Sequence, residues 1–174
     1  MKKSLLAVIG LILILIVAAC SEDTSNEIET QDIKKMVQDY SGKDSNEEVT
    51  ASITSEELIV TNSDNKEISY NLPEDEFFVS IAPFVEVTHP CTNHSLTGCQ
   101  GELAEKKFDV YIEDEDGNVI VDESMTSLKN GFIDFWLPRD KTYKVKIQYD
   151  GKVAESEIST FEGDNTCITT IQLI

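Results

Sequence analysis

The sequence has few basic residues. Its 174 residues include 14 lysines and arginines against 33 aspartates and glutamates, which gives a formal net charge of −19. Nucleic-acid binding depends on cationic side chains that neutralise phosphates, so this balance argues against a nucleic-acid partner. Carboxylates spread over a surface keep a protein soluble but are poor ligands for soft metals. We therefore interpret most of the acidic residues as solvated surface.

Several familiar patterns are missing. The chain has no evident internal repeat, no Gly-x-Ser-x-Gly elbow and no Cys-x-x-Cys pair. Ser95 beside His94 therefore lacks the setting of a hydrolase nucleophile, and the cysteine spacing is not that of a zinc ribbon. Asp114, Asp116 and Asn118 resemble a calcium loop only loosely, because the spacing to a distal glutamate is wrong. A hairpin turn accounts for these three residues.

The N-terminus has the pattern of an export signal. Lys2 and Lys3 precede an apolar run from Leu5 to Ala19, which is shorter than the ~20 residues that a spanning helix needs. The run ends in VAAC, which resembles the lipobox of bacterial lipoproteins. We predict a signal peptide over 1–19, lipidation of Cys20, a tether over 20–27 and anchoring to the outer face of the cytoplasmic membrane. An uncleaved signal anchor is the alternative.

Residues 28–73 are predicted to form a small α+β unit. Ile33, Met36, Val37 and Tyr40 recur at three- and four-residue spacing, which places them along one face of a helix over 28–40. Short β-type segments follow at 49–54, 58–62 and 68–72, separated by turn-forming clusters.

Residues 74–174 are predicted to form a β-sandwich. A PEDE segment separates them from the N-terminal unit, and the remainder is rich in strand-like segments joined by EDGN, NG and DG turns. The expected strands cover 77–87, 108–113, 119–123, 132–137, 143–149, 153–160 and 167–173. The predicted fold class is therefore α+β: a helix-plus-strands unit followed by a mainly antiparallel β-sandwich.

Rare side chains gather in one segment, residues 88–102, with the sequence THPCTNHSLTGCQGE. It contains both histidines of the chain, His89 and His94, together with Cys91 and Cys99. Thiolates and imidazoles are the donors that soft and borderline metals prefer, and the proline and glycines of the segment let the backbone bend around an ion. The sequence therefore predicts a metal site here.

Cys167 is a further candidate ligand from the last predicted strand. With Cys20 lipidated, three cysteines remain in an oxidising compartment, so internal disulfides cannot pair them all. Strand alternation places Cys167 on the same side as Thr169, Ile171 and Leu173, and it reaches the Cys/His segment if this strand lies beside the first strand of the sandwich. The alternative to a ligand role for Cys167 is a buried free cysteine, which is common in protein cores.

The donor set favours copper. Three cysteines are too few for the common iron–sulfur clusters, whereas Cu(I) accepts two or three thiolates, so zinc is the second candidate. Other interpretations stay open. In the first, Cys91 and Cys99 form a structural disulfide. In the second, they cycle between dithiol and disulfide in an oxidoreductase of the cell envelope. For His89, the alternative to metal binding is a cap at a strand end. For the whole protein, a further alternative is a purely structural lipoprotein.

Three stretches resemble a known family. FFVSIAPFVEVTHPCTNHSLTGCQGEL, NGFIDFWLPRDKTY and STFEGDNTCITTIQL closely resemble the CueP family of bacterial periplasmic copper-binding proteins. The resemblance implies a copper site formed by Cys91, Cys99 and Cys167, with His94 as the nearby histidine, and a role in copper tolerance. The lipobox departs from the freely soluble periplasmic members.

The sequence thus predicts an extracytoplasmic, lipid-anchored copper-binding protein and not an enzyme. It would bind Cu(I) and buffer it or pass it to a copper-accepting protein, with thiol reduction of Cu(II) and a homodimer left open. Its predicted metal ligands are Cys91, Cys99, Cys167, His94 and, with the weakest case, His89.

Overall fold

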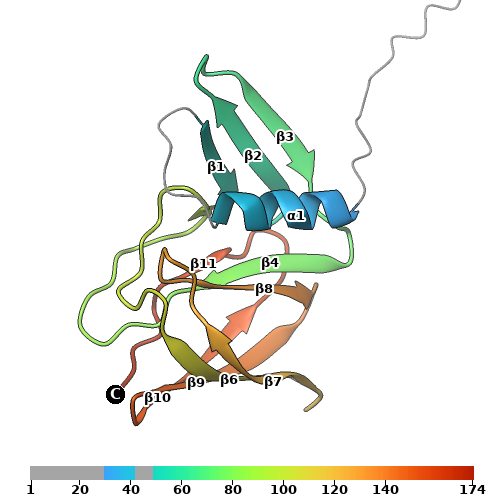
Figure 1. Cartoon of the computed structure of the whole chain (residues 1–174). Helices are drawn as coiled ribbons and strands as arrows, with labels where there is room; N and C mark the ends of the chain where they lie inside the picture. The colour runs from blue at the N-terminus through green and yellow to red at the C-terminus, as the bar shows by residue number, and fades with distance from the viewer. Residues whose placement is uncertain (1–29, 42–48) are drawn as a thin grey trace, which may run out of the picture.

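Figure 1 shows the chain in a computed structural model, which describes residues 30–41 and 49–174. The predicted signal peptide, the lipidation of Cys20 and the tether lie outside the described residues. Within the described ranges, no helix has the length and apolar character needed to cross a membrane.

The N-terminal unit contains the predicted helix and strands. Helix α1 covers Thr30–Ser41, and strands β1 (Val49–Ile53), β2 (Glu57–Asn62) and β3 (Glu67–Asn71) form an antiparallel meander. Ile33 and Val37, one turn apart on α1, are 2% exposed and pack on the sheet. The predicted amphipathic helix therefore covers the sheet and completes a small core.

The rest of the chain forms a sandwich of two sheets. A three-stranded sheet in the order β11-β4-β8 faces a four-stranded sheet in the order β10-β9-β6-β7. The strands are β4 (Glu76–Ile81), β6 (Lys107–Asp114), β7 (Val119–Thr126), β8 (Ile133–Pro138), β9 (Thr142–Tyr149), β10 (Lys152–Ser159) and β11 (Cys167–Ile168). The predicted α+β class with a mainly antiparallel sandwich is confirmed.

Strand β4 is the middle layer of the molecule. Phe77, Val79 and Ile81 point into the sandwich core, whereas Phe78 packs in the core of the N-terminal unit. Successive side chains of a strand point to opposite faces, so a continuous apolar run suits a strand covered on both sides. In Figure 1, α1 and β1–β3 lie on one side of β4 and β8, and the four-stranded sheet lies on the other.

Two predicted strands are shorter than expected. β4 ends at Ile81, and an isolated bridge between Phe84 and Gln172 is its continuation. Pro83 follows closely and has no N–H to donate to a neighbouring strand. β11 covers Cys167–Ile168 and pairs in parallel with β4, with Cys167 opposite Ser80. The last strand of the sandwich therefore lies beside the first, which is the condition under which Cys167 was expected to reach the Cys/His segment.

One strand was not predicted. β5 consists of His94–Ser95 and pairs antiparallel with β1, so that His94 lies opposite Ile53 and Ser95 opposite Ser52. The Cys/His segment thereby adds a fourth strand to the N-terminal sheet, in the order β3-β2-β1-β5. The predicted domain boundary at residue 73 stays a prediction, and the chain beyond it contributes strands to all three sheets.

Candidate metal centre

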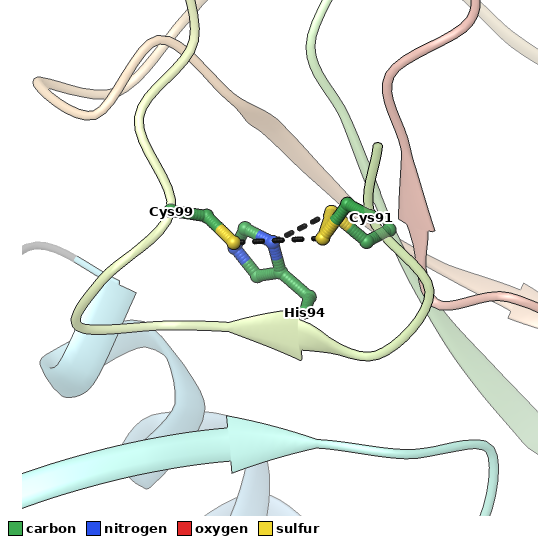
Figure 2. A group of neighbouring side chains, drawn as sticks. Cys91, His94 and Cys99 are labelled. Atoms are coloured by element: carbon green, nitrogen blue, oxygen red, sulfur yellow. Dashed lines mark hydrogen bonds between the residues drawn. A yellow bond between two sulfur atoms is a disulfide. The ribbon is translucent and has the colours of Figure 1, made fainter. Parts of the chain in front are cut away.

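Four of the five predicted ligands meet at one point. The potential ligand atoms of Cys91, His94, Cys99 and Cys167 all lie within 4.8 Å of one another. Two ligands that share an ion with bonds near ~2.3 Å lie at most about 4.6 Å apart. The cluster therefore has the size of one coordination shell to within a few tenths of an ångström. Figure 2 shows the side chains of Cys91, His94 and Cys99 gathered in one place, with a dashed line joining the sulfurs of Cys91 and Cys99.

Two of the sulfurs are joined. Cys91 and Cys167 form a disulfide with their Cα atoms 5.6 Å apart, and Cys99 is a free thiol with its Sγ 3.5 Å from that of Cys91. This corrects the local Cys91–Cys99 disulfide considered from the sequence. Sequence spacing favours the near partner, but the pairing of β11 with β4 brings the distant one closer. Because the thiolate is the metal-binding form of cysteine, Cys91 and Cys167 become strong ligands on reduction.

The last strand holds Cys167 in place through its backbone. Ser80 N donates to Thr166 O at 2.8 Å, and Cys167 N donates to Thr92 O at 3.1 Å. These bonds connect the end of the chain to β4 on one side and to the Cys/His segment on the other. The Cys167 side chain is 2% exposed and packs with Phe132.

A tight turn after β5 returns the chain so that Cys99 faces the cluster. Cys99 N donates to Ser95 O at 3.0 Å, and Gly101 N donates to Asn130 O at 2.6 Å. A Cβ atom on Gly101 would lie only 2.9 Å from the carbonyl oxygen of Gly131. The two backbones can approach this closely because neither residue has a side chain. The glycine therefore fixes the far end of the ligand segment.

His94 lies in an apolar setting. Its side chain is fully buried, with ring centroids 4.4 Å from Phe132 and 6.3 Å from Phe78. Burial, and to a lesser extent the nearby charge of His89, lowers the pKa of His94 to about 4. His94 is therefore neutral near pH 7 and offers a nitrogen lone pair without competition from a proton.

The ring nitrogens of His94 have few hydrogen-bond partners. Nδ1 lies 3.4 Å from Cys167 Sγ, and Nε2 is buried with no hydrogen-bond partner among the described residues. Buried polar atoms are nearly always paired, and an unpaired one needs a reason. A metal-binding role provides one, since the imidazole is grouped with three cysteine sulfurs and its nitrogens are ligands of soft and borderline metals.

His89 is not part of the cluster of four. Its side chain is half-buried, and its ring centroid lies 6.4 Å from that of Phe132, edge to face. The structure thus places His89 near the site but outside its closest group. Its role as a ligand stays a prediction.

Three residues around the site were not singled out from the sequence. Phe78 and Phe132 enclose the ring of His94, and Thr166 bonds to its backbone. Both phenylalanines lie in apolar runs, which gives no signal beyond ordinary core. The only hint for Thr166 is that it precedes Cys167.

Comparisons with known proteins agree with this geometry. The family model described as periplasmic copper-binding protein CueP matches residues 32–172. The crystal structure of S.CueP is similar to this chain with a TM-score of 0.76 and 38% sequence identity, over 82% of this chain and 88% of that chain. No curated protein matches the sequence. Because the family match spans most of the chain and the solved relative shares its fold, this protein belongs to the CueP family of periplasmic copper-binding proteins.

Proposed function

We propose that this copper-binding protein captures Cu(I) through the thiolates of Cys91, Cys99 and Cys167 and the imidazole of His94. The observation that carries the proposal is the convergence of their ligand atoms within 4.8 Å. Three soft thiolates beside a neutral imidazole match the preference of Cu(I) for sulfur donors and low coordination. The half-buried Cys91 and Cys99 face the outside, whereas Cys167 and His94 form the inner wall.

Zinc is the competitor to exclude, because three cysteines and one histidine also form structural zinc sites. Membership of a copper-binding family favours copper. The discriminating measurement is a titration of the reduced protein with each metal against a chelator of known affinity. Tighter retention of Zn(II) than of Cu(I) would overturn the assignment.

The test of the ligands uses the reduced protein without oxygen. Cu(I) is titrated against a competing chelator for the unaltered chain and for Cys91→Ser, Cys99→Ser and Cys167→Ser. Groups that only orient a ligand contribute about 10–100-fold to affinity, so we expect the loss of a thiolate to cost roughly a thousandfold. Equal affinity in all four proteins would show that copper binds elsewhere.

The disulfide suggests a second reaction of the reduced site, the reduction of Cu(II), which consumes two of the three thiolates that bind Cu(I). The thiolates of Cys91 and Cys167 would each give one electron to a Cu(II) ion, forming their disulfide and two Cu(I) ions. The expected result is one Cu(I) per thiol lost, measured with a Cu(I)-specific chelator and thiol titration under anaerobic conditions. Cu(I) formation that continues unchanged in Cys167→Ser would contradict this step.

A thiol–disulfide oxidoreductase is a second candidate, favoured by the free thiol of Cys99 at 3.5 Å from Cys91 Sγ. The Cys99 thiolate would attack Cys91, form a Cys91–Cys99 disulfide and release Cys167 as a thiolate. Catalytic turnover of a dithiol substrate would support this function. Stoichiometric copper retention without turnover supports binding alone.

Localisation at the membrane completes the proposal. The VAAC sequence supports lipidation of Cys20, which would hold the protein at the outer face of the cytoplasmic membrane, where it buffers copper or hands it to an accepting protein. Cys20→Ala should move the protein from the membrane fraction to the soluble fraction. Unchanged fractionation would contradict the lipid anchor. The homodimer remains a prediction.

A further inference from the structure

A single buried hydroxyl joins the two inner ligands of the site. Thr166 is fully buried, and its Oγ1 accepts a hydrogen bond from His94 N at 3.0 Å and donates one to Ile53 O at 2.7 Å. Both groups belong to the backbone of the N-terminal sheet, whereas Thr166 lies immediately before β11 in the sandwich. The hydroxyl is thus a link between two sheets.

The hydroxyl occupies a position in the strand ladder. His94 and Ile53 are register partners in the pairing of β5 with β1. In an antiparallel ladder, register partners either exchange backbone hydrogen bonds directly or point their N–H and C=O groups away from each other. Here the Thr166 hydroxyl lies between the N–H of His94 and the C=O of Ile53 and bonds to both. β5 has only two residues, so few other bonds fix it. The backbone of His94 therefore depends on Thr166 for its position.

Thr166 is also fixed to the other inner ligand. It is the covalent neighbour of Cys167, and its carbonyl accepts a hydrogen bond from Ser80 N of β4 at 2.8 Å. One residue therefore connects the backbone of His94 to that of Cys167, and the 3.4 Å approach of His94 Nδ1 to Cys167 Sγ follows from this short connection.

We propose that Thr166 is a positioning residue, which holds the imidazole of His94 within copper-binding reach of Cys167. The inference rests on the proposed function, since it concerns the same copper site. Groups that orient a metal ligand through a hydrogen bond typically change metal affinity by about 10–100-fold when removed. Thr166 acts through the backbone of the ligand and makes no contact with the ion.

The experiment compares Thr166→Val with Thr166→Ser and a matched control. Valine keeps the shape of threonine without its hydroxyl, whereas serine keeps the hydroxyl. Thr160→Val is the control, because Thr160 is equally buried and its Oγ1 likewise donates to Pro138 O at 2.9 Å and accepts from Lys141 N at 3.2 Å, away from the cluster. Copper affinity is measured by chelator competition, and copper ligation by X-ray absorption.

We expect Thr166→Val to bind Cu(I) about tenfold more weakly and to lose the nitrogen neighbour of copper from the absorption spectrum. Thr166→Ser should restore both readouts, and Thr160→Val should change neither, although both valine variants lose stability. Unchanged affinity with the nitrogen retained in Thr166→Val would overturn the inference. So would an equal loss in Thr160→Val.

A metal-free measurement separates this inference from the proposed function. Amide hydrogen exchange at His94 should be slow in the unaltered protein and in Thr166→Ser, and fast in Thr166→Val. Fast exchange in the unaltered protein, as at the exposed Asn93, would overturn the role of Thr166 even if no folded Thr166→Val were obtained. Slow exchange at His94 without thiol-dependent copper binding would instead reject the copper site and leave the positioning role in place.

Discussion

Two buried polar clusters of this protein differ in how their polar atoms are satisfied. Asp114, 2% exposed at the end of β6, accepts hydrogen bonds from Asp116 N at 3.1 Å, from Asn118 N at 2.9 Å and from Asn118 Nδ2 at 3.0 and 3.1 Å. Lys141 Nζ adds an ion pair at 2.7 Å. The carboxylate is thus surrounded by donors from its own hairpin and from Lys141, which immediately precedes β9.

His94 shows the opposite situation. Phe78 and Phe132 pack against its ring, Nε2 has no partner among the described residues, and Nδ1 lies 3.4 Å from the sulfur of Cys167. A carboxylate that already accepts five hydrogen bonds from four donor atoms has no lone pair left for a cation, whereas the imidazole of His94, whose Nε2 has no partner among the described residues, has one. Ligand capacity is therefore found where the local chain offers no donors, and not where acidic residues are densest.

The largest expected effect concerns the redox state of the Cys/His cluster. Cu(I) affinity should fall by about a thousandfold or more when the Cys91–Cys167 disulfide is intact, because two of the three sulfurs are then no longer thiolates. Chelator competition on the oxidised and reduced protein measures the difference. The matched control is Asp114→Asn, which should leave the affinity of both forms unchanged. Equal affinities in the two redox states would remove the contrast between the clusters.

The next effect is on stability. Opening the Cys91–Cys167 disulfide, which spans 76 residues, should lower the free energy of unfolding by about 2–4 kcal/mol, since the unfolded chain regains the entropy of a long loop. Urea unfolding of the metal-free protein with and without reductant measures this change. Cys99→Ser is the control, and reductant should destabilise it to the same extent. No change in the unaltered protein on reduction would contradict a structural contribution of the disulfide.

The pH dependence of stability should separate the two clusters. The pKa of His94 is lowered from 6.5 to about 4, so between these values the unfolded state takes up a proton that the folded state refuses. Stability should therefore fall as the pH drops from 6.5 to 4, by up to about 3 kcal/mol. His94→Gln should remove this dependence of stability on pH between 6.5 and 4.

Asp114 should act in a different pH window. The side chain of Asn118 and then that of Lys141 lower the pKa of Asp114 below its ordinary value of 3.8. The stability it contributes is present above that value and is lost only as the pH falls below it. Asp114→Asn should therefore leave the slope between pH 6.5 and 4 intact. A slope that survives in His94→Gln and disappears in Asp114→Asn would reverse the assignment.

The smallest expected effect is that of calcium. Millimolar Ca²⁺ should leave the midpoint of thermal unfolding unchanged, because a cation that finds no free carboxylate oxygen at Asp114 cannot stabilise the folded state. Differential scanning calorimetry with Ca²⁺, and with Na⁺ at equal ionic strength, is the measurement. A calcium-specific rise that disappears in Asp114→Asn would show that the hairpin is a metal site after all.

Local patterns in the sequence predicted most of the fold. The helix over 30–41 follows from apolar residues at three- and four-residue spacing, and most strands follow from alternation and turn residues. Both signals are properties of neighbouring residues. The existence of β5 was missed because it depends on pairing with β1, far away in the chain.

The candidate site was predictable in composition but not in connectivity. Scarce histidines and cysteines within one short segment indicated a soft-metal site, and burial alternates along Cys167, Thr169, Ile171 and Leu173 as expected. The disulfide partner of Cys91 was not predictable, because sequence distance favours Cys99. Nor was the enclosure of His94 by Phe78 and Phe132, which contact it only in the folded chain.

The sequence by itself determined which donors the protein has: thiols, imidazoles and an excess of carboxylates, with the soft donors gathered around residues 89–99. Only the tertiary structure decided which of them meet. The parallel pairing of β11 with β4 brings Cys167 to the ring of His94, 73 residues earlier in the chain. Such a distance is set by long-range strand pairing, and no local spacing of residues encodes it.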